Sequence, residues 1–210
     1  MYVYSDTIYP DSLIKFYKQA NYDIELRADA LSEVANASGE EILPDLSKIT
    51  AEKIEIIFHE GFHYYLIRNR VKDKNTITSR SLEEGAATIF GEMTARLFIE
   101  KYYSPKSRLL VEIKKSNKDF SRSYHQLNVL YGQLDSVYQD TLLPDAKKIT
   151  KAKVLYHNFH RHFGNAGLTG RLLYAHYYFA FREIWQNSAT PAAAVEKFIS
   201  IIGFVNDDNF

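Results

Sequence analysis

Two histidines, His59 and His63, enclose a glutamate in the segment His59-Glu60-Gly61-Phe62-His63. On a helix, residues four apart lie on one face about one turn apart, so both imidazoles can bind one metal ion from the same side. The glutamate between them can reach a water molecule on that ion and act as a general base. The spacing therefore predicts a zinc site with hydrolytic chemistry.

The residues around this segment predict the helix that the metal site needs. Thr50 suits the N-cap position, and Glu52 falls in the first turn, where the helix dipole favours an acid. Apolar residues dominate from Ile54 to Ile67. We therefore predict a helix over residues 51–70 that holds both histidines in apolar surroundings, which strengthen the hold on a metal.

A third ligand is available downstream. A catalytic zinc ion usually takes three protein ligands and keeps a fourth position for water. Glu84 lies 21 residues after His63, near the start of a helix predicted over residues 81–103. Ser81 and Glu84 also have the spacing of a capping box, which is an alternative explanation for this glutamate. The small residues Gly85 to Ala87 predict close packing of this helix on another backbone.

The histidine motif followed by Glu84-Gly85-Ala86-Ala87 resembles the gluzincin branch of the zincin metallopeptidases, over about residues 50–95. The resemblance implies a zincin-like domain that hydrolyses peptide bonds in a peptide or protein substrate. It implies Zn²⁺ bound by His59, His63 and Glu84, with Glu60 as general base and Glu83 as the fallback ligand. Many gluzincins carry a carboxylate four residues after the ligand glutamate, where this chain has Thr88; the hydroxyl of Thr88 and the carboxylate of Glu92, one turn further, are the two candidate substitutes.

A hydrolase of this kind also needs a donor for the negative charge that builds on the carbonyl oxygen. The helix that begins near residue 169 weakly resembles a segment that faces the metal in gluzincin-like families. Tyr174 and His176 are the candidate catalytic donors, and Arg171 is the candidate substrate-binding residue. The alternative explanation, which the spacing favours, is that Tyr174 and Tyr178, four residues apart, are core aromatics.

Composition limits the class of protein. The chain has 210 residues, 46% of them hydrophobic, and 26 basic residues balance 26 acidic residues. The neutral charge predicts no nucleic-acid partner, and the basic residues from Lys101 to Lys118 are interpreted as a solvated helix face. The chain has no cysteine and no apolar run long enough to span a membrane. If Met1 is the native start, the lack of a signal sequence predicts a cytoplasmic protein.

The periodicity predicts a mostly α fold with little or no β-sheet, in one zincin-like domain over residues 1–210. Residues 2–9 are the strand candidate. We predict an N-cap at Thr190 and an end at Gly203 for the last helix. The other predicted helices cover residues 11–20, 23–38, 106–143 (as two helices), 146–163 and 169–185.

Two other functions stay open. The first is a regulatory or binding module that keeps the metal site and has narrow or no peptidase activity, for which Thr88 in place of a carboxylate is the main argument. The second is a helical di-iron protein, because Glu60-x-x-His63 is half of that signature. The chain contains no second Glu-x-x-His, which argues against di-iron. The substrate sequence and the oligomeric state are not predicted.

Overall fold

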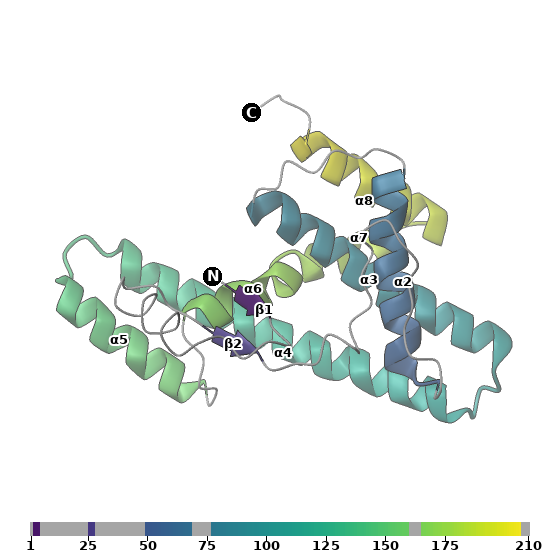
Figure 1. The fold of residues 1–210 in the computed structure, drawn as a ribbon, viewed down its shortest axis with the longest axis horizontal. Coiled ribbons are helices and arrows are strands. Elements are labelled where there is room, and N and C mark those ends of the chain that lie inside the picture. Colours follow the sequence, from purple (N-terminus) through teal and green to yellow (C-terminus); the bar gives the residue numbers. More distant parts are fainter. Residues whose placement is uncertain (1, 5–24, 28–48, 69–76, 160–164, 207–210) are drawn as a thin grey trace. The chain divides into compact units, whose positions relative to one another are not determined.

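The structure is a computed structural model that describes residues 2–4, 25–27, 49–68, 77–159 and 165–206. These residues form two short strands and seven helices, so the predicted mostly α fold with little β-sheet is confirmed. The elements in chain order are β1 (Tyr2–Tyr4), β2 (Glu25–Arg27), α2 (Ala51–Arg68), α3 (Ile77–Tyr102), α4 (Arg108–Gln139), α5 (Asp145–Asn158), α6 (Asn165–Ala175), α7 (Tyr178–Gln186) and α8 (Pro191–Asn206) (Figure 1).

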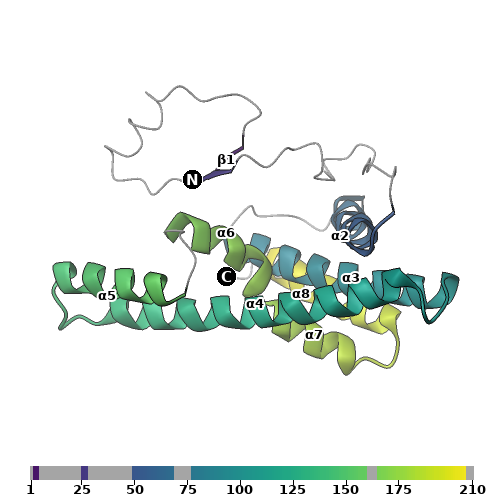
Figure 2. The ribbon, with the colours of Figure 1, turned by 90° about the horizontal axis from the view of Figure 1, so that it is seen from below.

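Contacts divide the chain into two compact units. The first joins Met1–Leu31 to His125–Leu172, and the second joins Ser32–Tyr124 to Leu173–Phe210. In the first unit, β1 pairs with β2 in parallel, with Tyr2 opposite Glu25. The end of α4 and α5 lie side by side (Figures 1 and 2), and Lys148 Nζ donates a 2.9 Å hydrogen bond to the Tyr138 carbonyl. This unit thus contains a helical hairpin, a short strand pair and most of α6.

The second unit contains all three predicted metal ligands. Its helices α2 and α3 cross each other, as the two views in Figures 1 and 2 show. The end of α2 packs with the start of α3 and with α7 and α8 in one buried cluster, in which Phe198 is fully buried. The start of α2 packs with the end of α3 and the start of α4 in a second cluster around Ile99 and Ile113. On α2, His59 lies between the residues of the two clusters, whereas Glu84 lies in the first third of α3, between Leu82 and Ala86 of the first cluster.

Two predicted helix caps are present. Thr50 Oγ1 accepts a 3.2 Å hydrogen bond from the Lys53 backbone N–H at the start of α2. Thr190 Oγ1 accepts a 3.2 Å bond from the Ala193 N–H at the start of α8. Both bonds satisfy first-turn N–H groups that have no partner within their own helix. The start of the histidine helix is thus fixed by its own sequence.

Several predicted boundaries are wrong. The two helices predicted over residues 106–143 are one long helix, α4 (Arg108–Gln139), because the chain has no proline between Pro105 and Pro144, and Gly132 faces open space and does not interrupt the helix. The helix expected over 169–185 is two helices, with a break at His176 and Tyr177. The last helix continues past Gly203 to Asn206.

Two N-terminal predictions also need correction. Residues 25–27 form a strand, where we had predicted a helix over 23–38; they supply the partner that the strand candidate at residues 2–9 needed. The helix predicted over 11–20, the rest of 23–38 and strand residues 5–9 lie outside the described residues. α3 begins at Ile77, so Ser81 lies inside the helix and the capping-box interpretation of Glu84 is wrong.

Candidate metal centre

The structure brings His59, His63 and Glu84 together at the crossing of α2 and α3. His59 Nε2 lies 3.2 Å from His63 Nε2 and 3.2 Å from Glu84 Oε2. His63 Nε2 lies 3.4 Å from the same Glu84 oxygen. Among the described residues, these three form the one group of histidines and acids placed to hold a metal ion. Glu84, and not the fallback Glu83, completes it.

The triangle of donor atoms fits a tetrahedral metal ion. Zinc bonds of about 2.0–2.1 Å in a tetrahedron place neighbouring donor atoms roughly 3.3–3.4 Å apart. The three edges measured here, 3.2, 3.2 and 3.4 Å, agree with that spacing. The two imidazole nitrogens and the carboxylate oxygen converge on one point. A single proton can form a hydrogen bond between only two of these three atoms at a time. A cation at their centre satisfies all three.

The charges in the group favour a cation. Burial acts to raise the pKa of Glu84, but hydrogen bonds to His59 and His63 outweigh it and lower that pKa to about 2. Burial acts to lower the pKa of His63, but the hydrogen bond to Glu84 and its charge outweigh it and raise that pKa. Glu84 therefore carries a negative charge in a partly covered site.

Solvent reaches the three ligands only in part. Their side chains are 17% (His59), 15% (His63) and 24% (Glu84) exposed. Low exposure strengthens electrostatic interactions, since less water screens them. Each of the three side chains thus keeps a small contact with solvent.

A close helix contact fixes this geometry. A Cβ built on Gly91 of α3 would lie 2.9 Å from the Glu55 carbonyl oxygen and 3.1 Å from the His59 Cβ, both on α2. Only glycine tolerates that approach without a shift of one helix. A Cβ built on Gly85 of α3 would lie 3.2 Å from the Tyr177 Cβ. The small-residue pattern predicted this close contact, whereas the sequence did not predict the one at Gly91.

Replacing Gly91 by alanine is expected to move α2 away from α3 at His59. We expect a loss of about 1–3 kcal/mol in the free energy of unfolding, the usual cost of overpacking, together with weaker zinc binding. Urea unfolding and zinc titration measure the two effects. Gly132→Ala on α4 is the control, because a Cβ there meets nothing within 4 Å. A Gly91→Ala protein as stable as the Gly132→Ala protein would contradict the close-contact argument.

The other predicted site residues are Tyr174, His176 and Arg171. The Tyr174 ring lies 6.2 Å from the His59 ring between centroids, and 38% of Tyr174 is exposed. His176 is exposed, with its ring 4.6 Å from that of Tyr177. Arg171 belongs to the first unit, where its Nη1 donates to the Gly167 carbonyl at 3.2 Å. Tyr174 thus lies beside the ligand His59.

Glu60 is half-buried on α2, and its negative charge acts on His63 to raise the pKa of that histidine. The hydroxyl of Thr88 donates to the Glu84 backbone carbonyl at 2.7 Å, within its own helix. Glu92 accepts a 2.8 Å hydrogen bond from the Tyr178 hydroxyl. The contacts of Thr88 and Glu92 thus lie away from the ligand histidines.

Two acids near the site are buried, which the sequence did not predict. Glu55, one turn before His59, is 8% exposed, and Glu92 on α3 is 3% exposed. Burial raises the pKa of Glu92 to about 7 against the opposing effects of Tyr178 and Arg182. Burial, and then the charge of Glu92, raise the pKa of Glu55 to about 8. Glu55 is the one acid between Lys53 and the histidine motif. That isolated position is the sequence signal that could have identified Glu55.

These pKa values predict a pH dependence of stability. Because the folded state raises the pKa of Glu92, the protonated carboxyl group stabilises the folded state. This contribution to stability is complete below the unfolded pKa of 4.5 and is lost as pH rises through about 7. Glu92→Gln removes the cost of ionising this group. We expect the variant to match the parent near pH 5 and to exceed its free energy of unfolding by about 1–3 kcal/mol above pH 8.

Urea unfolding of both proteins at the two pH values measures this difference. Glu183→Gln, on the exposed face of α7, is the control and should leave the pH profile unchanged. A constant difference between Glu92→Gln and the parent across this range would show that Glu92 does not titrate there.

No helix within the described ranges is long and apolar enough to cross a membrane. No protein-family profile matches the chain, and no curated protein or solved structure gives a significant match.

Proposed function

We propose that this protein is a zinc-dependent hydrolase of peptide bonds. His59 and His63 on α2 and Glu84 on α3 hold the metal. The observation that carries the proposal is the triangle of their donor atoms, with edges of 3.2, 3.2 and 3.4 Å. When bound, Zn²⁺ polarises a carbonyl group and makes water a stronger acid.

Glu60 is the general base in this proposal. It lies between the two ligand histidines in one helical turn, and its charge acts on His63. Its carboxylate accepts a proton from the attacking water and then passes that proton to the leaving amine. Both transfers need a carboxylate within hydrogen-bond reach of the site, and the position of Glu60 next to His59 supports this.

Tyr174 supplies the oxyanion donor in this proposal. Its ring lies beside His59, and part of its surface is open to solvent. A phenol hydroxyl donates a hydrogen bond to the carbonyl oxygen as negative charge builds there. The roles of His176 as a second catalytic donor and of Arg171 as a substrate-binding residue stay predictions.

A regulatory or binding module with the same metal site is the second candidate. The observation that favours it is that Thr88 and Glu92 are engaged by Glu84 and Tyr178, respectively. Outer-shell carboxylates that orient a ligand histidine raise metal affinity and activity. A protein that binds zinc and cleaves no generic peptide would have this second function.

Metal analysis combined with a cleavage screen tests the proposal. Mass spectrometry of the purified protein is expected to give about one zinc per chain. A peptide library is then incubated with the protein before and after chelation. Cleavage that disappears on chelation and returns with added zinc supports the hydrolase. No stoichiometric metal after zinc is supplied would overturn both candidate functions.

A further inference from the structure

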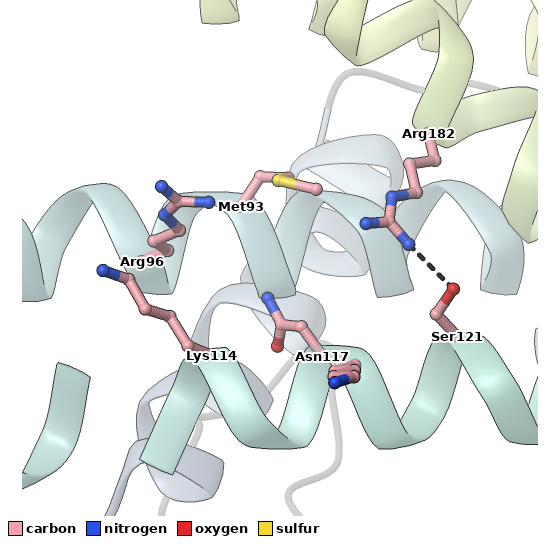
Figure 3. A pocket seen from close by; sticks show the side chains of 7 residues that line it. Met93, Arg96, Lys114, Asn117, Ser121 and Arg182 are labelled. Carbon is pink, nitrogen blue, oxygen red and sulfur yellow. Dashed lines mark hydrogen bonds between the residues drawn. The ribbon is translucent and has the colours of Figure 1, made fainter. Parts of the chain in front are cut away.

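A pocket of about 220 Å³ lies in the second unit, apart from the metal ligands (Figure 3). Helices α3, α4 and α7 supply its walls. The lining residues are Met93, Arg96, Lys114, Asn117, Lys118, Ser121 and Arg182. Four of these seven side chains are cationic and none is acidic. The pocket is therefore strongly positive, although the whole chain is neutral.

The cations come from three different helices. Arg96 lies on α3, Lys114 and Lys118 lie one turn apart on α4, and Arg182 lies on α7. Like charges four residues apart on a helix repel each other. Lys114 and Lys118 belong to the basic stretch that the sequence alone interprets as a solvated helix face. Both are exposed, as expected, but they face a pocket that two more cations line.

The described part of the chain supplies little opposite charge to this pocket. Arg96 pairs with Glu100 at 2.9 Å, and no ion pair joins Lys114 or Lys118 to an acid in the described residues. The acids nearest to them on α4 pair elsewhere, Glu112 with Arg108 and Asp119 with Arg122. The charges of Lys114 and Lys118 are thus available to a ligand, whereas Arg96 pairs with Glu100 and the charge of Arg182 also acts on the buried Glu92.

Neutral groups hold Arg182 in place. Its Nη1 donates to Ser121 Oγ at 2.9 Å (Figure 3) and lies 3.5 Å from the Tyr178 hydroxyl. Ser121 accepts that bond, so its own hydroxyl proton can still be donated. With its amide nitrogen toward Glu55, Asn117 donates to that carboxyl at 2.7 Å, which fixes another part of the wall. A guanidinium and a hydroxyl are therefore held ready for an anion.

We propose that this pocket binds a phosphate group, with Arg96, Lys114, Lys118 and Arg182 as its cationic partners. Guanidinium and ammonium groups are the usual partners of phosphate oxygens. Several converging cations suit a doubly charged oxyanion better than a single carboxylate. A water molecule occupies roughly 30 Å³, so the volume of about 220 Å³ admits a phosphate or pyrophosphate group with a few waters.

Calorimetric titration of the full chain at constant ionic strength tests the proposal, with inorganic phosphate, pyrophosphate and acetate as probes. We expect one saturable site for phosphate, tighter binding of pyrophosphate, and no saturable binding of acetate. Pyrophosphate also binds zinc, so each titration is run with zinc-loaded and zinc-free protein, and the phosphate affinity should be the same in both.

The double variant Lys114→Gln/Lys118→Gln is expected to weaken phosphate binding about tenfold or more, because two charge-assisted contacts are lost. Lys115→Gln is the matched control, since Lys115 is exposed on the same helix but does not line the pocket; it should change binding less than about twofold. Arg96→Gln is a second test should the double variant fail to fold. No saturable binding, an equal loss in the control, acetate binding as tight as phosphate, or dependence on zinc would each overturn the proposal.

Discussion

Glu60→Gln is expected to lower peptide hydrolysis by about 10²–10⁴-fold, the usual contribution of a general base, while the zinc content stays at that of the parent protein. Glutamine keeps the shape of the side chain and cannot accept the proton. Glu60 lies outside the group of metal ligands, so its replacement should leave the bound metal in place. The rate of cleavage of a peptide from the screen, measured beside zinc content, gives both values.

Glu83→Gln is the matched control for this experiment. Glu83 and Glu60 both act on His63 through their charge, and neither belongs to the metal group. An electrostatic effect alone would lower activity in both variants. Full activity in Glu60→Gln would contradict the assigned base, and an equal loss in Glu83→Gln would assign the effect to charge and not to proton transfer.

Loss of a residue that only hydrogen-bonds a metal ligand typically weakens metal binding roughly 10–100-fold. Glu84→Gln changes a ligand itself, so it is expected to weaken zinc binding by more than that. It removes the negative charge in the donor triangle and leaves two imidazoles, whose nitrogens lie 3.2 Å apart. Competition with a coloured chelator measures the affinity. His63→Ala, which removes a different corner, should have an effect of similar size.

Glu83→Gln serves again as the control for metal affinity. Sequence alone left Glu83 as the fallback ligand, and the structure places Glu84 in the group. Loss of zinc in Glu83→Gln together with its retention in Glu84→Gln would reverse that assignment. Retention of zinc in both variants would show that the two histidines suffice to bind it.

The sequence predicted that His59, His63 and Glu84 lie together, as the structure shows, and its signals for the two histidines are local. Four-residue spacing on a helix places His59 and His63 on one face, whatever the rest of the fold does. The side chain of Thr50 caps α2 through a bond to a residue three positions away. Glu84 was a candidate by its distance along the chain, and α3 places it against both histidines.

The sequence did not predict the features that depend on contacts between residues far apart in the chain. Gly91 matters because of Glu55 and His59 on another helix, and no local pattern distinguishes it from Gly132. The burial of Glu92 depends on Tyr178, 86 residues away. The break at His176 and Tyr177 falls within a run of residues that all tolerate a helix, and Tyr177 lies against Gly85 of α3. Each of these features needs the packed structure.

The crossing of α2 and α3 has a consequence for folding. Its ligands come from both helices, with Glu84 placed 21 residues after His63. An ion bound there closes a loop of the chain and binds the folded state in preference to the unfolded one. At a metal concentration a hundred times the dissociation constant, this linkage adds roughly 2.7 kcal/mol to the free energy of unfolding. The same ion that activates water would thus hold the two crossed helices together, and the stability of this unit would follow the supply of metal.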